Sequence, residues 1–165
     1  MLKKLFLFAM ICVALSGTMA QAQNQVEKIS FDELMPLLKR ENSRLKVVNF
    51  WATWCRPCVA EMPHFEALAA EFEQSLEVIY VSLDDPATAE SRVQAFVEKK
   101  GIANPVYVLT DTDPNTYVDR VDPSWSGSLP ATILFPPGGG TPVFHEGDFS
   151  AAELHKFVQP HLPAE

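Results

Sequence analysis

The sequence predicts an α/β protein whose mixed central sheet is covered by helices on both faces. Three observations lead to this class. Short apolar runs rich in β-branched residues alternate with segments of helical periodicity, two Ser-x-x-Glu capping boxes mark helix starts, and a Pro-Gly-rich turn separates two apolar runs near the end of the chain. The chain has 165 residues, 47% of them hydrophobic, and shows no internal repeat or linker, so we expect one domain.

The first half of the chain predicts two helices on either side of a buried strand. A capping box at residues 30–33 opens a helix that we expect to end near Arg40. The nearly continuous apolar run at residues 47–51 predicts a strand buried on both faces. Pro57 suits the first turn of the next helix, whose apolar spacing continues to about Phe72.

The second half continues the alternation and then ends in a hairpin and a helix. A turn at residues 136–140 joins the hairpin strands, and a second capping box at residues 150–153 opens the last helix. The other expected elements are strands at residues 78–83 and 106–109, helices at 87–100 and 114–120, and hairpin strands at 132–135 and 142–144.

Charge and composition exclude several classes of function. A net charge of −8 argues against nucleic acid as a partner, because phosphate neutralisation needs a basic face. Three cysteines are too few for a disulfide-dense scaffold or a four-cysteine zinc site. The aspartates near the ends of predicted strands lack calcium-loop spacing and are expected to be strand-end caps or solvated surface; they are Asp84, Asp85, Asp111 and Asp113.

Residues 1–22 have the pattern of a secretory signal peptide. Lysines near the start form a positive region, residues 5–15 are apolar, and residues 20–22 read Ala-Gln-Ala, which fits a cleavage site. An uncleaved membrane anchor is the alternative, but a bilayer requires about 20 apolar residues. We therefore expect cleavage after residue 22 and an exported, periplasmic domain of residues 23–165.

The cysteine pair carries the chemistry. Trp54-Cys55-Arg56-Pro57-Cys58 lies between a predicted buried strand and a predicted helix start. At a helix N-terminus the free N–H groups and the helix dipole stabilise the Cys55 thiolate, and Arg56 adds positive charge. Cys58 is one turn further along and can attack a disulfide formed at Cys55. The pattern predicts thiol–disulfide exchange, with Cys55 as nucleophile and Cys58 as resolving thiol.

Other interpretations of the pair are a metal site, a structural disulfide and two free buried thiols. A metal site needs two more ligands, whereas the four histidines show no metal-ligand spacing near the motif; they are His64, His145, His155 and His161. A disulfide across two residues closes a very short loop and stabilises little. Free buried cysteines are commoner in cytosolic proteins than in exported ones.

The segment at residues 50–58, Phe-Trp-Ala-Thr-Trp-Cys-Arg-Pro-Cys, resembles the active-site segment of the thioredoxin superfamily. Val-Ala-Glu-Met-Pro at residues 59–63 narrows the resemblance to the TlpA/ResA-like thiol–disulfide oxidoreductases, exported relatives associated with cytochrome c maturation and periplasmic thiol reduction. Residues 128–132 are similar to the family's cis-proline segment. The resemblance covers about residues 47–161 and implies a thioredoxin fold with an N-terminal extension and an inserted strand–helix region.

The resemblance implies further site residues. A cis peptide bond before Pro130 would place it beside Cys55, with Leu129 next to it on the substrate face. Glu61 lies three residues after Cys58 on the same helical face, where it can exchange protons with the resolving thiol; a solvated surface glutamate is the alternative. Asn49 replaces the aspartate of cytosolic thioredoxins at the matching strand position, which leaves the proton-accepting role to Glu61.

The substrate face is also expected to include Trp54, Arg56, Pro57 and Trp125. Trp54 is predicted to pack beside Cys55, with core filling as the alternative, and simple packing is the alternative for Trp125.

The sequence thus predicts a protein-disulfide reductase that needs no cofactor beyond its cysteine pair. We expect a monomer that acts on disulfide-bearing proteins and is recharged by an electron donor in the membrane. The other functions considered are a copper-binding chaperone, a disulfide-forming oxidant and a peroxidase of the peroxiredoxin type. Known copper chaperones of this kind space their cysteines by three residues, and the peroxidase needs a Pro-rich loop before its cysteine, which residues 48–54 lack.

Overall fold

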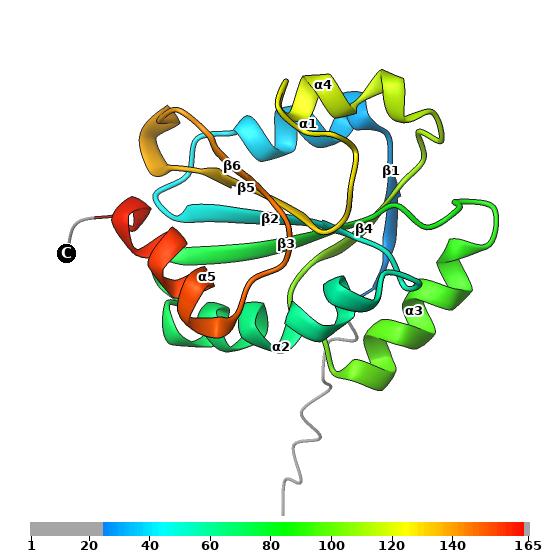
Figure 1. Ribbon diagram of the computed structural model, residues 1–165, viewed down its shortest axis with the longest axis horizontal. Helices are drawn as coiled ribbons and strands as arrows, with labels where there is room; N and C mark the ends of the chain where they lie inside the picture. Colours follow the sequence, from blue (N-terminus) through cyan, green and yellow to red (C-terminus); the bar gives the residue numbers. More distant parts are fainter. Residues whose placement is uncertain (1–24, 164–165) are drawn as a thin grey trace, which may run out of the picture.

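The computed structural model describes residues 25–163, which form a six-stranded mixed sheet with helices on both faces (Figure 1). The strand order is β1-β4-β3-β2-β5-β6. The predicted signal peptide at residues 1–22 lies outside the described residues. None of the described helices is both long enough and apolar enough to cross a bilayer.

The elements follow one another as the sequence analysis predicts, apart from the first strand. The strands are β1 (Glu27–Ile29), β2 (Leu45–Trp51), β3 (Leu76–Ser82), β4 (Val106–Leu109), β5 (Ala131–Phe135) and β6 (Val143–Glu146). The helices are α1 (Phe31–Lys39), α2 (Arg56–Glu71), α3 (Ala89–Lys100), α4 (Val118–Val121) and α5 (Ala151–Val158). The predicted short helix at residues 114–120 is a 3-10 turn, Pro114–Thr116, followed by α4.

The sheet combines a parallel part with an antiparallel hairpin. β2 pairs in parallel with β3, β3 with β4, and β4 with β1, whereas β5 is antiparallel to both β2 and β6. β1 and α1 precede the strand that leads to the cysteine pair, where the N-terminal extension was expected, and α3 and β4 lie between β3 and α4. This arrangement places the C-terminal ends of β2, β3 and β4 at the same edge of the sheet, where functional loops of α/β proteins gather.

Each face of the sheet has its own apolar cluster. Along β2 the side chains alternate, so that Val47 and Trp51 join the cluster under α2, α3 and α5, while Val48 and Phe50 join the cluster under α1 and α4. Both faces of β2 are therefore buried, as its apolar run predicts.

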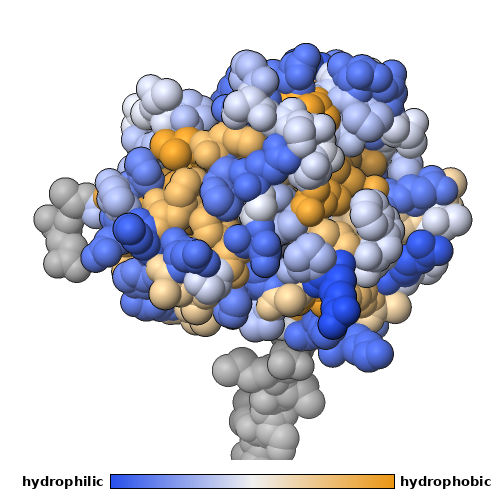
Figure 2. All heavy atoms as spheres, viewed as in Figure 1, coloured by the Kyte–Doolittle hydropathy of each residue, from blue (hydrophilic) through white to orange (hydrophobic). Residues whose placement is uncertain are grey.

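The surface is mostly polar, with apolar residues gathered between β6 and α5 and again beside the segment that joins α4 to β5 (Figure 2). The large hydrophobic side chain that stands exposed among residues 25–163 is Trp54, at 67% of its surface. Core filling, the alternative considered for Trp54, is therefore excluded.

Candidate active site

The cysteine pair lies where β2 passes into α2. β2 ends at Trp51, three residues form a loop, and Cys55 is the N-cap residue of α2. Cys55 and Cys58 form a disulfide with their Cα atoms 5.4 Å apart, and the backbone N–H of Cys58 donates to Cys55 Sγ at 3.4 Å. The predicted position of the pair at a helix N-terminus is thus confirmed.

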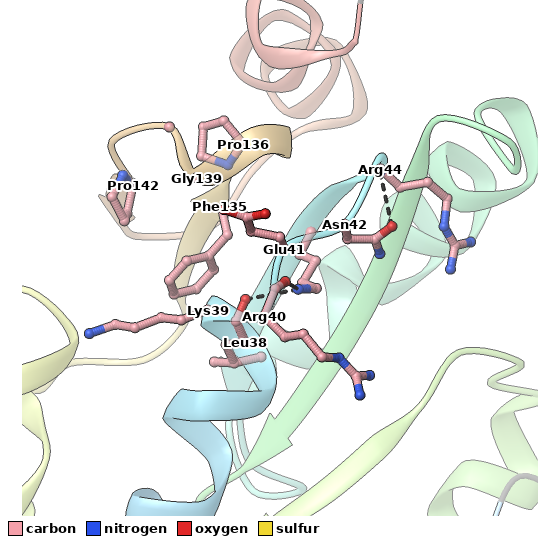
Figure 3. Close-up of a pocket in the computed structure, with 12 residues that line it drawn as sticks. Leu38, Lys39, Arg40, Glu41, Asn42, Arg44, Phe135, Pro136, Gly139 and Pro142 are labelled. Atoms are coloured by element: carbon pink, nitrogen blue, oxygen red, sulfur yellow. Dashed lines mark hydrogen bonds between the residues drawn. The ribbon is translucent and has the colours of Figure 1, made fainter.

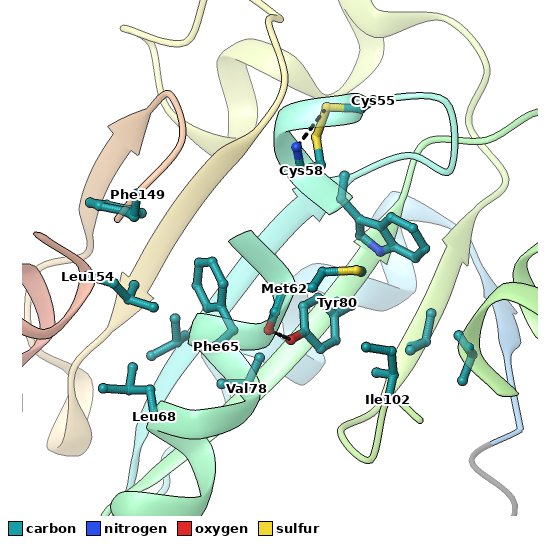
Figure 4. Close-up of a cluster of buried hydrophobic side chains, with 14 of the residues drawn as sticks. Cys55, Cys58, Met62, Phe65, Leu68, Val78, Tyr80, Ile102, Phe149 and Leu154 are labelled. Atoms are coloured by element: carbon teal, nitrogen blue, oxygen red, sulfur yellow. Dashed lines mark hydrogen bonds between the residues drawn. A yellow bond between two sulfur atoms is a disulfide. The ribbon is translucent and has the colours of Figure 1, made fainter. Parts of the chain in front are cut away.

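Both cysteines are buried in the apolar cluster that includes Met62 and Phe65 (Figure 4). Cys55 keeps 5% of its surface exposed, whereas Cys58 has none. Arg56 and Pro57, the first two residues of α2, are exposed beside the pair. After reduction of the disulfide, the Cys55 sulfur at the start of the helix would keep the hydrogen bond from the Cys58 N–H, which favours its ionised form.

Glu61 is buried at this site and does not lie on the solvated surface. Its side chain is 1% exposed, on the same face of α2 as Cys58. Asn49 Nδ2 donates to Oε1 of Glu61 at 2.9 Å, and the backbone N–H of Phe149 donates to Oε2 at 2.9 Å. The same Asn49 amide nitrogen donates to Thr132 Oγ1 at 3.1 Å. Both carboxyl oxygens are therefore held, one from β2 and one from the loop before α5.

Burial raises the pKa of Glu61 to about 7, because removing the carboxylate from water penalises its charged form. The hydrogen bonds from Phe149 and Asn49 favour the charged form and limit the rise in the pKa, whereas the negative charge of Asp148 adds to it. A carboxyl group with a pKa near neutrality can both accept and release a proton under ordinary conditions.

The peptide bond between Leu129 and Pro130 is cis, as the resemblance implies. Leu129 is half-buried and Pro130 is buried at the start of β5, where the carbonyl of Pro130 accepts a hydrogen bond from Gly147 N at 2.9 Å. This contact ties the proline segment to the end of β6.

Trp125, expected on the substrate face with simple packing as the alternative, is buried in the core. It is 3% exposed, and its ring centroid lies 5.0 Å from that of Phe50. Its indole N–H donates to the carbonyl of Ser128 at 2.8 Å. Packing against the sheet explains the burial of Trp125, and its hydrogen bond to Ser128 joins it to the segment that precedes Pro130.

Asp84 is a buried residue of the site that sequence reasoning placed among caps and solvated aspartates. It follows β3 and hydrogen-bonds to Thr53 in the loop before the cysteines. Asp85, next in the chain, is exposed as expected. One signal in the sequence distinguishes the buried Asp84 from the exposed Asp85. Asp84 is one residue closer to the end of β3, at the edge of the sheet where the cysteine pair lies.

A pocket of about 270 Å³ lies at the opposite end of β2 from the disulfide, where the C-terminal end of α1 meets the β5–β6 turn. It includes Lys39, Arg40 and Arg44, but the charged ends of these side chains point away from one another (Figure 3). They do not converge on a common ligand position. Within residues 25–163, moreover, no three His, Cys, Asp or Glu residues are grouped in a way that could hold a metal ion.

Solved structures with the same architecture come from several bacteria. A thioredoxin-related protein from Neisseria meningitidis serogroup B aligns with a TM-score of 0.63 at 23% identity, covering 75% of this chain and 89% of that one. StoA from Bacillus subtilis aligns with a TM-score of 0.55 at 19% identity, covering 72% and 85%. Fold and site together define a thioredoxin-fold protein with a Cys-x-x-Cys disulfide at the start of a helix.

The chain belongs to the AhpC/TSA family, which matches residues 18–139. Curated relatives include the thiol-disulfide oxidoreductase ResA of Halalkalibacterium halodurans, 33% identical over 68% of this chain and 59% of the relative. ResA of Oceanobacillus iheyensis is 32% identical over 71% of this chain and 57% of the relative. The chain therefore matches less than two thirds of the length of these relatives. The predicted likeness to TlpA/ResA-type proteins is confirmed.

Proposed function

We propose that this protein is a thiol–disulfide oxidoreductase that reduces disulfides in other proteins. The observation that carries the proposal is the Cys55–Cys58 disulfide at the N-terminus of α2, where Cys55 is the N-cap residue and keeps 5% of its surface exposed, whereas Cys58 has none exposed. In the proposed mechanism the substrate meets Cys55, and Cys58 acts from within the protein. The likeness to ResA proteins supports the same activity.

In the proposed reaction the Cys55 thiolate attacks one sulfur of a substrate disulfide, and the other substrate sulfur leaves as a thiolate. The resulting mixed disulfide joins Cys55 to the substrate. Cys58 then loses its proton to Glu61 and attacks Cys55, which releases the second substrate thiol. Two electrons pass to the substrate, and the protein is left with the Cys55–Cys58 disulfide.

The charges around the cysteine pair favour reduction of substrate disulfides over their formation. The positive charge of Arg56 stabilises a thiolate but is exposed, where salt screens it. Glu61, when ionised, opposes thiolate formation from within the protein. We expect a reduction potential of about −200 to −270 mV, in the range of reducing members of this fold and well below the value near −120 mV of a strong oxidant.

The proposal extends to an exported protein, on the signal-like pattern of residues 1–22. An exported reductant needs electrons from outside its compartment, so we propose a donor in the membrane. The resemblance to TlpA/ResA-like proteins makes the apoproteins of cytochrome c candidate substrates.

The activity is tested by mixing the reduced protein with oxidised insulin and following the thiols released. Equilibration against glutathione buffers gives the potential of the same preparation. Release of insulin thiols with a potential near −200 mV or below supports a reductant, whereas a potential near −120 mV would favour a disulfide-forming oxidant. Tight binding of Cu(I), or consumption of peroxide without insulin reduction, would favour the copper chaperone or the peroxidase instead.

A further inference from the structure

A buried carboxylate holds the loop that precedes the cysteine pair. Asp84 is 1% exposed and lies two residues beyond β3. The backbone N–H of Thr53 donates to Oδ2 of Asp84 at 2.8 Å, and the Thr53 hydroxyl donates to Oδ1 at 2.6 Å. The Ser82 hydroxyl adds a third hydrogen bond to Oδ2 at 2.8 Å. Both oxygens of one carboxylate are thus directed at a single residue of the loop.

Burying a carboxylate is costly, and the cost is offset here by charge-assisted hydrogen bonds, which are stronger than neutral ones. Leu83 N donates to the carbonyl of Trp51 at 2.8 Å, the last backbone bond between the two chain segments before the loop departs. Beyond that point, Asp84 provides the link between the loop and the end of β3. Asp84 thus fixes the loop at Thr53. Thr53 directly precedes the exposed Trp54.

Cys55 is held in a different way. As the N-cap of α2 it accepts a hydrogen bond on Sγ from Cys58 N, and its carbonyl accepts one from Val59 N at 3.1 Å. A third contact lies in the loop itself, where Cys55 N donates to the carbonyl of Ala52 at 3.1 Å and closes a turn over Thr53 and Trp54. The Sγ atom is held from the helix, and none of these three contacts involves Asp84 directly. Loss of Asp84 should therefore disturb Trp54 more than the sulfur of Cys55.

We propose that Asp84 is a positioning residue that holds Thr53, and through it Trp54, in place for the docking of protein substrates. The proposal rests on the proposed reductase function. Asp84 acts on the surface that meets a polypeptide and leaves the sulfur chemistry of Cys55 largely unchanged. A protein disulfide needs that surface, whereas a small disulfide reaches Cys55 without it.

The test compares oxidised insulin with the small aromatic disulfide 5,5′-dithiobis(2-nitrobenzoate). The variants are Asp84→Ala, Asp84→Asn and Thr53→Val, with Asp85→Ala as the matched control on the exposed neighbouring aspartate. In Asp84→Ala we expect kcat/KM for insulin to fall about tenfold, chiefly through KM, the loss expected for one charge-assisted hydrogen bond. The reaction with the small disulfide should stay within about twofold in the same variant.

Asp84→Asn keeps an oxygen that can accept from Thr53 and should recover most of the lost activity with insulin. Thr53→Val removes only the hydroxyl donor and should give a smaller loss with the same selectivity. If Asp84→Ala does not fold, Thr53→Val decides the question. Equal losses on both substrates, or no loss on either, would overturn the proposal.

Fluorescence tests the positioning role of Asp84 independently of the reductase activity. Trp51 and Trp125 are buried, so the component of the emission that acrylamide quenches comes from Trp54. The anisotropy of that component should fall in Asp84→Ala and stay unchanged in Asp85→Ala. A wild-type protein that reduces neither disulfide would refute the reductase function alone. An unchanged anisotropy in Asp84→Ala would refute the positioning role, whatever the activity.

Discussion

Glu61 of α2 and Asn49 of β2 are joined by a hydrogen bond of 2.9 Å in the interior of the protein. The amide donates and the carboxyl group accepts, so the contact favours the ionised form of Glu61. The Oδ1 atom of Asn49 has no hydrogen-bond partner within residues 25–163. The side chain of Asn49 is therefore hydrogen-bonded through its nitrogen alone within the described residues, to Glu61 and to Thr132. These two contacts fix the position of the Asn49 side chain.

Replacing Glu61 by Gln should slow disulfide reduction and flatten its dependence on pH. The wild-type rate should rise as the pH passes the Glu61 pKa of about 7, because only the carboxylate can accept the proton of Cys58. We expect a decrease of about a hundredfold above this pH, the lower end of the range for a positioned proton acceptor. Stopped-flow measurements between pH 5 and 9 give the profile. Glu71→Gln, an exposed change on the same helix, is the control, and an identical profile in Glu61→Gln would exclude the role.

The same residue should make stability fall with increasing pH. The folded-state pKa of Glu61, about 7, lies above the ordinary value of 4.5, so the folded protein binds the proton more tightly than the unfolded chain. The stabilisation is complete below pH 4.5 and is lost as the pH rises through 7. At about 1.36 kcal/mol per pKa unit, the loss is at most about 3 kcal/mol. Urea unfolding of the oxidised protein at several pH values should show this slope in the wild type and not in Glu61→Gln.

Removing the donor at Asn49 should raise the pKa of Glu61 further. Asn49→Ala deletes the hydrogen bond that favours the carboxylate, and such a bond to a charged group is worth about 1.5 kcal/mol, or about one pKa unit. The ¹³C resonance of the Glu61 carboxyl group, assigned by comparison with Glu61→Gln, reports the midpoint directly. Thr132→Val removes the other acceptor of the amide and should shift the midpoint less. A midpoint unchanged in Asn49→Ala would show that the hydrogen bond does not tune the carboxyl group.

The two cysteines should respond differently to the same substitution. Cys55→Ser should abolish the reduction of insulin, because Cys58 is enclosed and cannot reach a substrate. Cys58→Ser should retain the first attack and accumulate mixed disulfides, visible on non-reducing gels and by mass spectrometry. Identifying the partners trapped by Cys58→Ser in cells would also name the substrates. Normal turnover by Cys58→Ser would refute the two-thiol mechanism.

The helices and strands that local signals define could be predicted from the sequence. The capping boxes at Ser30 and Ser150 form as expected, and Gly101 ends α3 in the left-handed conformation. β1 could not be predicted, because two of its three residues are exposed and charged and the strand with which it pairs, β4, lies far along the chain.

β2 begins two residues before the predicted strand for a reason outside the strand itself. Its second residue, Lys46, is buried because Nζ donates to the carbonyl of Leu38 at 3.0 Å at the end of α1. A lysine within an apolar run normally indicates exposure, and only the packing of α1 against the sheet reverses that expectation.

In the candidate site, too, features encoded by a local motif could be predicted, whereas features that depend on distant contacts could not. The cysteine pair, its helix and the cis bond before Pro130 follow from a compact motif and its resemblance to a known family. The burial of Trp125 and of Asp84 depends on contacts with segments distant in the sequence, Phe50 for the first and the Thr53 loop for the second. Neither residue differs from its exposed alternatives in local pattern, so the sequence alone could not distinguish them.

The enclosure of Cys58 has a consequence for how the protein is recharged. In the proposed cycle an incoming donor thiol attacks Cys55 of the oxidised protein, because Cys58 has no exposed surface. We therefore expect substrate and donor to use the same sulfur and the same patch of surface around Trp54, at different times. The two cannot be bound together, so turnover should follow ping-pong kinetics in which an excess of either one excludes the other.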